Sequence, residues 1–475
     1  MFRLLLSLAG EDILMALSAW WLLLIAVPVL LLGEQLVRRI PALARVDMPV
    51  PVVGGFVIAL IMLFLNLAGT DIAWQSKVSA RAWTWLVSTE IEWLKSPAPA
   101  TEIYLPLSTA FFTCVGLNAS WQVARRGSWM LLILLSIATG LAVVQNLLGV
   151  SLARSMGVSS YLGLLCGSVT LTGGPSTAIG FADAFKQVGF TNASEVGMAA
   201  AMFGIVAGSL LGGPLGGLLI RRHRLTSRLP DVAPASEVRA SVFQPVPSLA
   251  MAGIGAVLTN YGGAAPRMES TPITPMPRGI VPQIRALWEL GSVALIHIVI
   301  LVACIKLGAW VGYALRSAGL KFPVYMGAML VGLTLRNVLD ASGVRILGTH
   351  VINLIGSIAL ALFLAIAMSS LNLLQLKTLA APMLLILLAQ VVLMLAFAWF
   401  ITFNCLGRDF DAAVASAGHV GFGLGITPNA VATMDVLTAK FGSAPRAFLC
   451  VTIVGAFLID FTNALTITIW MNFLK

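Results

Sequence analysis

The chain has 475 residues, 59% of them hydrophobic and only 10% charged, whereas soluble domains carry about 25% charged residues. This composition excludes a soluble globular protein. In such a chain the formal net charge of +10 indicates basic cytoplasmic loops rather than nucleic-acid binding. The cysteines show neither metal-site spacing nor a disulfide framework.

Several apolar runs reach the roughly 20 residues that a helix needs to cross a bilayer. The clearest are 13–33, 129–150, 196–220, 291–313, 350–371 and 379–403. The first run lacks a strongly basic start and a small-residue cleavage site, so we expect a retained helix rather than a signal peptide. The sequence therefore predicts an all-α polytopic membrane protein.

Charged loops give the expected orientation. Arg38, Arg39 and the pair Arg125–Arg126 mark inner loops, and the acidic segment 69–101 between them is placed outside. Segment 221–286 contains eight arginines and is rich in Pro, Ser and Gly, which predicts a flexible cytoplasmic linker. Both termini then lie on the outer side, with five crossings before the linker.

The second half of the chain repeats the order of the first. The matching segments are 50–55 with 322–327, 111–120 with 362–372, and 174–179 with 426–431. With five crossings per half, the second half enters the membrane from the opposite side. This predicts two inverted-topology repeats of five transmembrane helices, an arrangement typical of secondary transporters. The expected division is 1–220, the linker 221–286, and 287–475.

Two Gly-rich segments, 163–187 and 412–440, are too interrupted for plain helices. Irregular backbone survives in the hydrocarbon region only where protein or a water-filled cavity satisfies its amide groups. We predict that each is a re-entrant hairpin, the first entering from outside and the second from inside, and that they meet near the midplane.

A broken helix aims free N–H groups at a cavity, where its positive end favours a carboxylate. The unwound carbonyl groups suit a hard cation such as sodium. The candidate substrate-binding residues are Thr172, Gly173, Gly174, Ser176, Thr177, His419, Gly421, Gly423, Gly425, Thr427 and Asn429.

Polar residues inside apolar runs supply candidate sodium ligands. Asp460, with Asn463 one turn later, lies in the last run, where a carboxylate is costly unless it is paired or coordinated. Asn118 is placed similarly beside Gly116. The candidate set is Asn118, Thr427, Asp460 and Asn463, with structural pairing as the alternative for Asp460.

Several stretches of the chain resemble one known family. They read PVPVVGG (49–55), FFTCVGLNAS (111–120), GFTNASEV (189–196), AGHVGFGLGITPNAVATM (417–434) and VGAFLIDFTNALTI (454–467). In these motifs the chain resembles the bacterial sodium/glutamate symporters. The resemblance implies sodium-driven uptake of L-glutamate, a small anionic amino acid, across the bacterial inner membrane. It also implies a homodimer, an elevator-like movement, and sodium as coupling ion without an organic cofactor. With the orientation expected from the charged loops, both termini are then periplasmic.

The first hairpin departs from the family pattern Ser-Gly-Gly-His-Gly-Thr-Gly. Pro175 replaces the histidine and Ala178 replaces the last glycine. A sodium-coupled transporter of a different carboxylate is therefore the first alternative. An intramembrane serine protease, with Ser176 as nucleophile and His419 as base, is a second alternative from another class. A passive channel is the third.

Three further features carry an interpretation, and for the first two the sequence leaves two alternatives. Lys306 either snorkels toward the membrane surface or lines a helix seam. Arg446 either attracts a substrate carboxylate or anchors a helix at the inner face. The segment 69–101 contains Trp74, Trp83, Trp85 and Trp93, which favours an interfacial element.

Overall fold

The computed structural model describes residues 15–45, 48–68, 72–74, 77–78, 80–95, 101–120, 129–227, 280–318, 323–344, 346–376 and 379–474. Most of the predicted linker, 221–286, lies outside these residues, as does the Arg125–Arg126 pair. The described secondary structure is almost entirely helical, which agrees with the predicted class.

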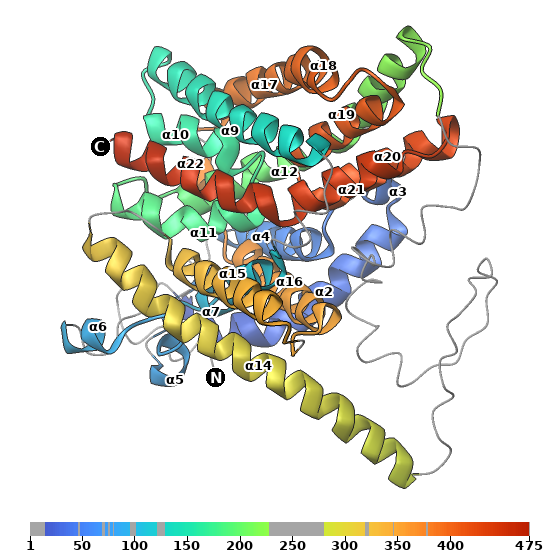
Figure 1. Cartoon of the computed structure of the whole chain (residues 1–475). Helices are drawn as coiled ribbons and strands as arrows, with labels where there is room; N and C mark the ends of the chain where they lie inside the picture. The colour runs from blue at the N-terminus through green and yellow to red at the C-terminus, as the bar shows by residue number, and fades with distance from the viewer. Residues whose placement is uncertain are drawn as a thin grey trace.

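Chain order divides the helices into those before and those after residues 228–279, which lie outside the described residues (Figure 1). The first half has α2 (Ala19–Arg39), α3 (Pro41–Arg45), α4 (Val50–Leu67), α5 (Arg81–Thr84), α6 (Glu90–Lys95), α7 (Leu105–Asn118), α9 (Trp129–Ser155), α10 (Ser160–Leu164), η1 (Leu165–Val169), α11 (Gly174–Gln187) and α12 (Ala193–Arg222). The second half has α14 (Ile280–Ser317), α15 (Val324–Ser342), α16 (Thr349–Ser369), η3 (Leu373–Leu376), α17 (Ala380–Phe397), η4 (Ala398–Thr402), α18 (Phe403–Cys405), α19 (Phe410–Gly423), α20 (Thr427–Phe441), α21 (Pro445–Ile453), η5 (Val454–Leu458) and α22 (Ile459–Phe473).

Two short strand pairs accompany the segment 69–101, called the outer segment after its predicted location. Strand β1 (Met15–Leu17) pairs in parallel with β2 (Ile72–Trp74). Strand β3 (Lys77–Val78) pairs antiparallel with β4 (Thr101–Glu102). The described part of the segment 69–101 is therefore tied to the residues just before α2 and to those just before α7.

Within the described residues, seven helices are long and apolar enough to cross a membrane. They are α2, α4, α9, α12, Leu295–Ser317 of α14, α16, and Ala380–Cys405, which joins α17 to α18. The pair α21 and α22, bent by 43°, makes an eighth if counted as one span. A polytopic membrane protein is thus confirmed. Helices α7 and α15 stand at two more expected crossings but are not among these spans, so ten crossings stays a prediction.

By packing, the long helices form two groups. The frame group is α2, α4, α7, α14, α15 and α16, three helices from each half (Figure 1). Glycines stand where these helices cross: a Cβ on Gly54 would lie 2.1 Å from the carbonyl oxygen of Val29, and one on Gly327 would lie 2.1 Å from that of Gly308. In membranes such small residues let helix backbones approach closely.

The break group comprises α9 to α12 and α17 to α22, again drawn from both halves. Here α12 packs on α11, α19 and α20, while α9 packs on α10, α17 and α22. The two groups touch over smaller areas. At one of them Tyr325 of α15 stacks on Phe112 at a ring distance of 3.8 Å and meets Phe181 of α11 edge to face at 6.0 Å.

A large side chain at a frame crossing should separate two helices. We expect Gly327→Leu to lower the free energy of unfolding by about 1–3 kcal/mol, the usual cost of overpacking. Thermal unfolding of the detergent-purified protein, followed by tryptophan fluorescence, measures this. Gly140→Leu on α9 is the control, because a Cβ there meets nothing within 4 Å. Equal losses in both variants would contradict the packing.

Candidate functional site

The first helix break, an interruption of helical backbone in the continuous chain, separates η1 from α11. Gly167, inside η1, has the non-helical angles φ −98° and ψ −137°. Gly174 has φ +68°, a region that glycine enters without steric cost. Pro175 follows in the first turn of α11, where its missing N–H leaves no helical hydrogen bond unmade. The Gly-Gly-Pro sequence therefore ends one helix and starts the next.

The second break separates α19 from α20. Ile426 is extended, with φ −139° and ψ 159°, and α20 then begins with a proline in its first turn. A Cβ on Gly421 would lie 2.5 Å from Cα of Ala430, so the two helices fold back on each other. They have 14 and 15 residues, about 21–22 Å each, less than the roughly 30 Å of a hydrocarbon core.

The two breaks touch. A Cβ on Gly174 would lie 3.0 Å from Cγ2 of Ile426 and 3.3 Å from the carbonyl oxygen of Gly425. Helix α12 passes beside both, because a Cβ on Gly204 would lie 2.1 Å from the carbonyl oxygen of Leu424 and 2.8 Å from Leu171. Two Gly-rich segments that are far apart in the chain are therefore in direct contact in the fold.

Gln145 of α9 joins the two breaks by hydrogen bonds. Its Oε1 accepts from the Thr172 hydroxyl at 2.7 Å, and its Nε2 donates to the carbonyl oxygen of Gly423 at 3.0 Å. Gln390 of α17 donates in turn to the carbonyl oxygen of Gln145 at 2.7 Å. Both glutamines are fully buried. The sequence reasoning missed them, although a buried amide inside an apolar run is itself a sign of a functional polar site.

A second polar cluster holds the first break against α22. The backbone N–H of Ser168 donates to Oδ1 of Asn146 at 2.9 Å, and Nδ2 of Asn463 donates to the carbonyl oxygen of Ser168 at 2.9 Å. Three buried atoms of this cluster have no protein partner among the described residues: Asn146 Nδ2, Ser168 Oγ and Asn463 Oδ1. Unpaired buried polar atoms cost about 1–3 kcal/mol each, so the cluster suits a polar or ionic ligand.

The second break has its own polar atoms. Asn429 donates to the carbonyl oxygen of Ile205 at 3.0 Å, and its Oδ1 is buried without a partner in the described chain. Thr427 donates to the carbonyl oxygen of Gly455 in η5 at 2.5 Å. These contacts connect the second break to α12 and to the bend between α21 and α22.

Asp460 begins α22 beside this bend and is half-buried. Within the described residues its carboxylate makes no hydrogen bond or ion pair, whereas Asn463, one turn later, contacts the first break. A carboxylate and an amide oxygen at a bent helix are donors of the kind that hard cations prefer.

Most residues predicted for the site come together. Thr172, Gly173, Gly174, Ser176 and Thr177 lie at the first break or in the first turn of α11. The second break and the helices beside it hold the others: His419, Gly421, Gly423, Gly425, Thr427, Asn429, Asp460 and Asn463. Asn118 lies apart at the end of α7, where its amide donates to Asn353 of α16 at 2.8 Å.

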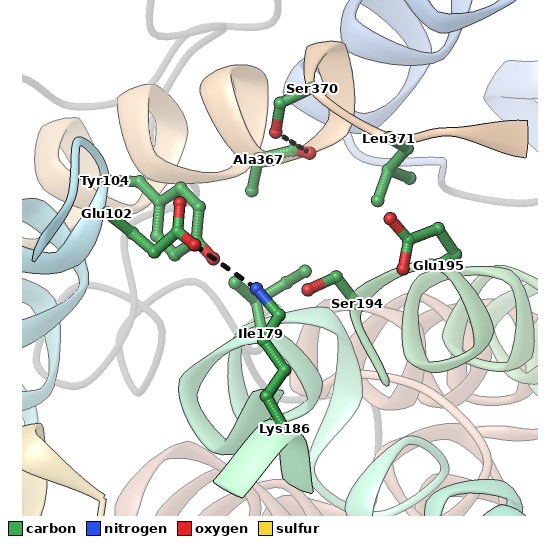
Figure 2. A pocket seen from close by; sticks show the side chains of 9 residues that line it. All are labelled: Glu102, Tyr104, Ile179, Lys186, Ser194, Glu195, Ala367, Ser370 and Leu371. Atoms are coloured by element: carbon green, nitrogen blue, oxygen red, sulfur yellow. Dashed lines mark hydrogen bonds and ion pairs between the residues drawn. The ribbon is translucent and has the colours of Figure 1, made fainter. Parts of the chain in front are cut away.

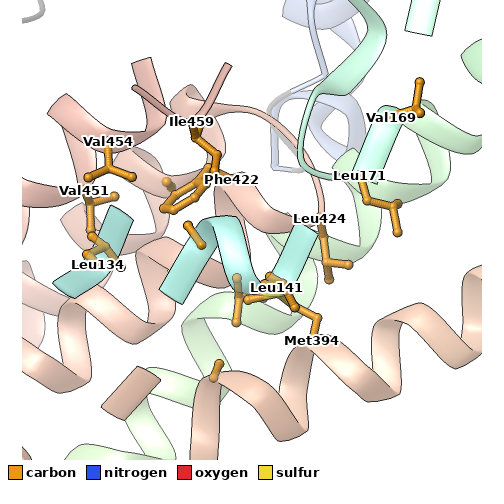
Figure 3. Packing of buried hydrophobic residues seen from close by; sticks show 14 of the residues in the cluster. Leu134, Leu141, Val169, Leu171, Met394, Phe422, Leu424, Val451, Val454 and Ile459 are labelled. Atoms are coloured by element: carbon orange, nitrogen blue, oxygen red, sulfur yellow. The ribbon is translucent and has the colours of Figure 1, made fainter. Parts of the chain in front are cut away.

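Apolar side chains surround the two breaks (Figure 3). Leu141 and Met394 lie beside Gly423, and Leu171 and Leu424 pack at the breaks themselves. These residues are fully buried, so the polar atoms of the breaks lie in a shell that excludes water. Inside such a shell, electrostatic interactions are stronger than in water.

His419 does not contact Ser176 in the described structure. Its Nδ1 lies 2.9 Å from Oγ1 of Thr402, and its ring packs near Phe422 and Phe397. The nucleophile–base hydrogen bond of a serine protease is therefore not formed between these residues.

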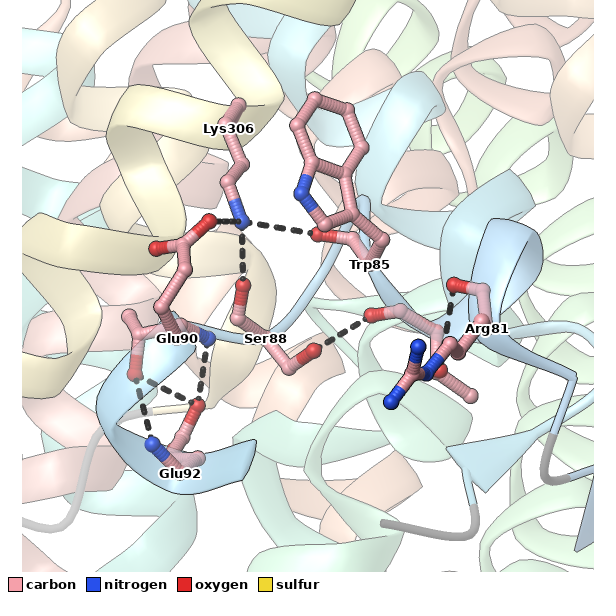
Figure 4. Close-up of polar contacts among 8 residues, drawn as sticks. Arg81, Trp85, Ser88, Glu90, Glu92 and Lys306 are labelled. Carbon is pink, nitrogen blue, oxygen red and sulfur yellow. Dashed lines mark hydrogen bonds and ion pairs between the residues drawn. The ribbon is translucent and has the colours of Figure 1, made fainter. Parts of the chain in front are cut away.

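Two cations from the sequence analysis are engaged in ion pairs. Lys306 donates to the carbonyl oxygens of Trp85 and Ser88 at 3.1 and 2.9 Å and pairs with Glu90 at 2.8 Å (Figure 4). The hydrogen bond from Lys306 lowers the pKa of the Glu90 carboxyl. Arg446 pairs with Asp409 at 2.7 Å and with Asp411 at 3.2 Å. Lys306 therefore binds the outer segment to α14, and Arg446 ties α21 to α19.

Short broken helices that meet inside a membrane-spanning bundle, with buried polar atoms at the breaks, define a secondary transporter rather than an enzyme. The family model described as sodium/glutamate symporter matches residues 15–89, 81–241 and 288–443. The chain belongs to the sodium/glutamate symporter family.

Curated relatives match over nearly the whole chain. The sodium/glutamate symporter of Escherichia coli (strain K12) is 34% identical over 444 residues, 93% of this chain and 94% of the relative. The one from Shigella flexneri matches equally. That of Haemophilus influenzae is 32% identical over 449 residues, 94% and 95% of the two chains. No solved structure matches this chain.

The bridge made by Gln145 can be tested by its removal. Gln145→Leu leaves the carbonyl oxygen of Gly423 and the hydroxyl of Thr172 without their partner, so we expect a loss of about 1–3 kcal/mol in the free energy of unfolding. Hydrogen exchange at residues 170–174 and 424–427 should also become faster. The control is Gln35→Leu at an exposed position of α2. Unchanged exchange at both breaks would refute the bridge.

Proposed function

We propose that the protein is a secondary active transporter that carries L-glutamate with sodium into the cell by alternating access. The observation that carries the proposal is the meeting of two broken helices around buried polar atoms, in a chain of the sodium/glutamate symporter family. The site geometry suits a carboxylate and a hard cation at once, because broken helices present free N–H groups and free carbonyl oxygens side by side.

The substrate would lie at the first turns of α11 and α20. Each helix has a proline in its first turn, and the positive end of each helix dipole attracts a carboxylate. The hydroxyls of Ser176, Thr177 and Thr427 lie at these turns, and glutamate has two carboxylates to offer. A different carboxylate is the second candidate, because Pro175 replaces the family's histidine at the start of α11.

Sodium would bind where α22 meets the first break. The oxygens of Ser168 and Asn463 that lack protein partners, together with the Asp460 carboxylate, supply hard ligands. Thr427 reaches the same bend through Gly455. Asn118 stays in the predicted set but lies outside this cluster.

The two halves would be inverted repeats, 1–220 and 287–475, separated by the cytoplasmic linker 221–286. In support, each half contributes three helices to the frame group and then a long helix, a broken segment and a last helix to the break group. The segments 163–187 and 412–440 would be the re-entrant hairpins. Alternating access would move the break group against the frame group, and the family resemblance adds a homodimer in the bacterial inner membrane.

Contacts between helix ends support the proposed topology. The hydroxyl of Tyr161 donates to the carbonyl oxygen of Leu474 at 3.4 Å. The proposed topology assigns both residues to the periplasmic side. The hydroxyl of Ser227 donates to the carbonyl oxygen of Ser443 at 2.7 Å. The proposed topology assigns both residues to the cytoplasmic side. An inverted repeat with periplasmic termini puts each contacting pair at one membrane surface.

Uptake by proteoliposomes tests the function. We expect an inward sodium gradient to drive labelled L-glutamate into the vesicles, and Asp460→Asn to reduce the initial rate at least about tenfold. Glu92→Gln, which removes a carboxylate from the outer segment, should transport normally. Flux without a gradient would indicate a channel, and sodium-driven flux of another carboxylate alone would replace glutamate as the substrate.

The sodium site predicts a selective change in affinity. Asn463→Ala should raise the sodium concentration for half-maximal uptake on the order of tenfold, with a smaller change in the glutamate concentration for half-maximal uptake. Asn472→Ala is the matched control, because this asparagine lies on the same helix and only donates to the carbonyl oxygen of Thr468. A shift confined to glutamate would move Asn463 to the substrate site.

Cysteine labelling tests the orientation. Cys405 is exposed, and the other four cysteines are buried. Placed at the cytoplasmic end of α18, Cys405 should react in intact cells only with a membrane-permeant maleimide. In a Cys405→Ser background, Ser317→Cys at the end of α14 should react with an impermeant reagent from outside. The opposite pattern would reverse the orientation and the proposed direction of both hairpins.

A further inference from the structure

A polar cavity lies between the frame group and the break group, away from the two breaks. Its volume is about 60 Å³. From the frame side it is lined by Glu102, Tyr104 and Ser370, and from the break side by Lys186, Ser194 and Glu195 (Figure 2). Glu102 ends β4 just before α7, whereas Glu195 lies in the first turn of α12. In the proposed orientation the cavity opens toward the periplasm.

One carboxylate oxygen in this cavity has no partner. Glu102 is 3% exposed, and its Oε1 lies 3.2 Å from Nζ of Lys186 across the two helix groups. Its Oε2 is buried without a hydrogen bond from any described residue. Burying a charged oxygen without a partner is costly, so the cavity favours an occupant that this oxygen can bind.

The charges around the cavity are unbalanced. Nζ of Lys186 also lies 3.7 Å from Oδ1 of Asp183, and its charge interacts electrostatically with that of Glu195. The other cation of this group among the described residues is Lys77. It interacts electrostatically with Asp183, and its backbone stands opposite Glu102 in the register of the β3–β4 ladder. Among the residues that the structure describes, three carboxylates therefore face two ammonium groups, which leaves one negative charge in excess. That excess favours a cation over a water molecule at Oε2 of Glu102.

We propose that this cavity is an outer binding site for a small monovalent cation, separate from the sodium site proposed beside Asn463. The ligands would be Oε2 of Glu102, the Glu195 carboxylate, and the hydroxyls of Tyr104 and Ser194, all hard oxygens. The occupant is either a sodium ion or the ammonium group of the amino-acid substrate. The periplasmic position and these two sources rest on the proposed function; binding to the cavity itself does not.

Occupancy of the cavity links the two helix groups. Glu102 and Tyr104 belong to the frame side, and Ser194 and Glu195 to the break side. A cation held by both sides stabilises this arrangement of the groups relative to any arrangement that separates them. External cation would thus shift the population of conformations before the site at the breaks is filled.

The test uses the purified full-length protein in detergent and follows thermal unfolding. Sodium chloride is titrated against choline chloride at constant ionic strength without glutamate. In a second arm, choline glutamate is titrated without sodium. Each titration gives the salt concentration at which half of the maximal rise in unfolding temperature is reached. We expect Glu102→Gln and Glu195→Gln each to raise this concentration about tenfold in one of the two arms. The arm that responds identifies the sodium ion or the substrate ammonium.

Glu90→Gln is the control, because it removes the same charge from the outer face at a carboxylate that does not line the cavity. It should leave both titrations unchanged. Identical titrations for wild type, Glu102→Gln and Glu195→Gln would show that the cavity holds water only and would overturn the proposal. Wild-type uptake in proteoliposomes is measured separately, so absence of sodium-driven glutamate transport would refute the proposed function without deciding this site.

Discussion

The fold depends on how interrupted backbone is satisfied inside an apolar bundle. Each break leaves N–H and carbonyl groups without helical partners, and lipid offers none. Here buried amide side chains supply part of what is missing: Gln145 reaches both breaks, Asn146 and Asn463 hold Ser168, and Asn429 binds α12. The breaks therefore persist because neighbouring straight helices contribute polar groups to them.

The same arrangement shields the proposed site from water. The broken segments lie in one helix group with apolar side chains around them, so any ligand there exchanges water for fixed protein dipoles. The frame group touches this assembly through smaller surfaces, among them the ring of Tyr325 against Phe181. A bundle divided in this way can change the side from which its site is reached while the site itself stays intact.

Much of the fold could be predicted from the sequence, because its signals are local. Apolar runs give the spans, and Gly-Gly-Pro at 173–175 and Thr-Pro at 427–428 give the two breaks. The site was predicted less completely. Gln145 and Gln390 look like isolated polar residues in leucine-rich helices, and only packing across the bundle shows that they meet. Asn118 carries the same local signal, yet it pairs with Asn353 instead. The division into two groups depends on contacts between distant segments, which no local pattern encodes.

The attachment of the outer segment to α14 has a practical consequence. Lys306 holds Trp85 and Ser88, and Trp83 donates to the carbonyl oxygen of Ile103 at 2.9 Å, next to Glu102. The part of the segment that contains α5 and α6 is therefore joined to the frame group. A fluorophore or an antibody fragment placed on α5 or α6 would serve as a fixed reference point, against which displacement of a second label on α11 or α20 could be measured during turnover.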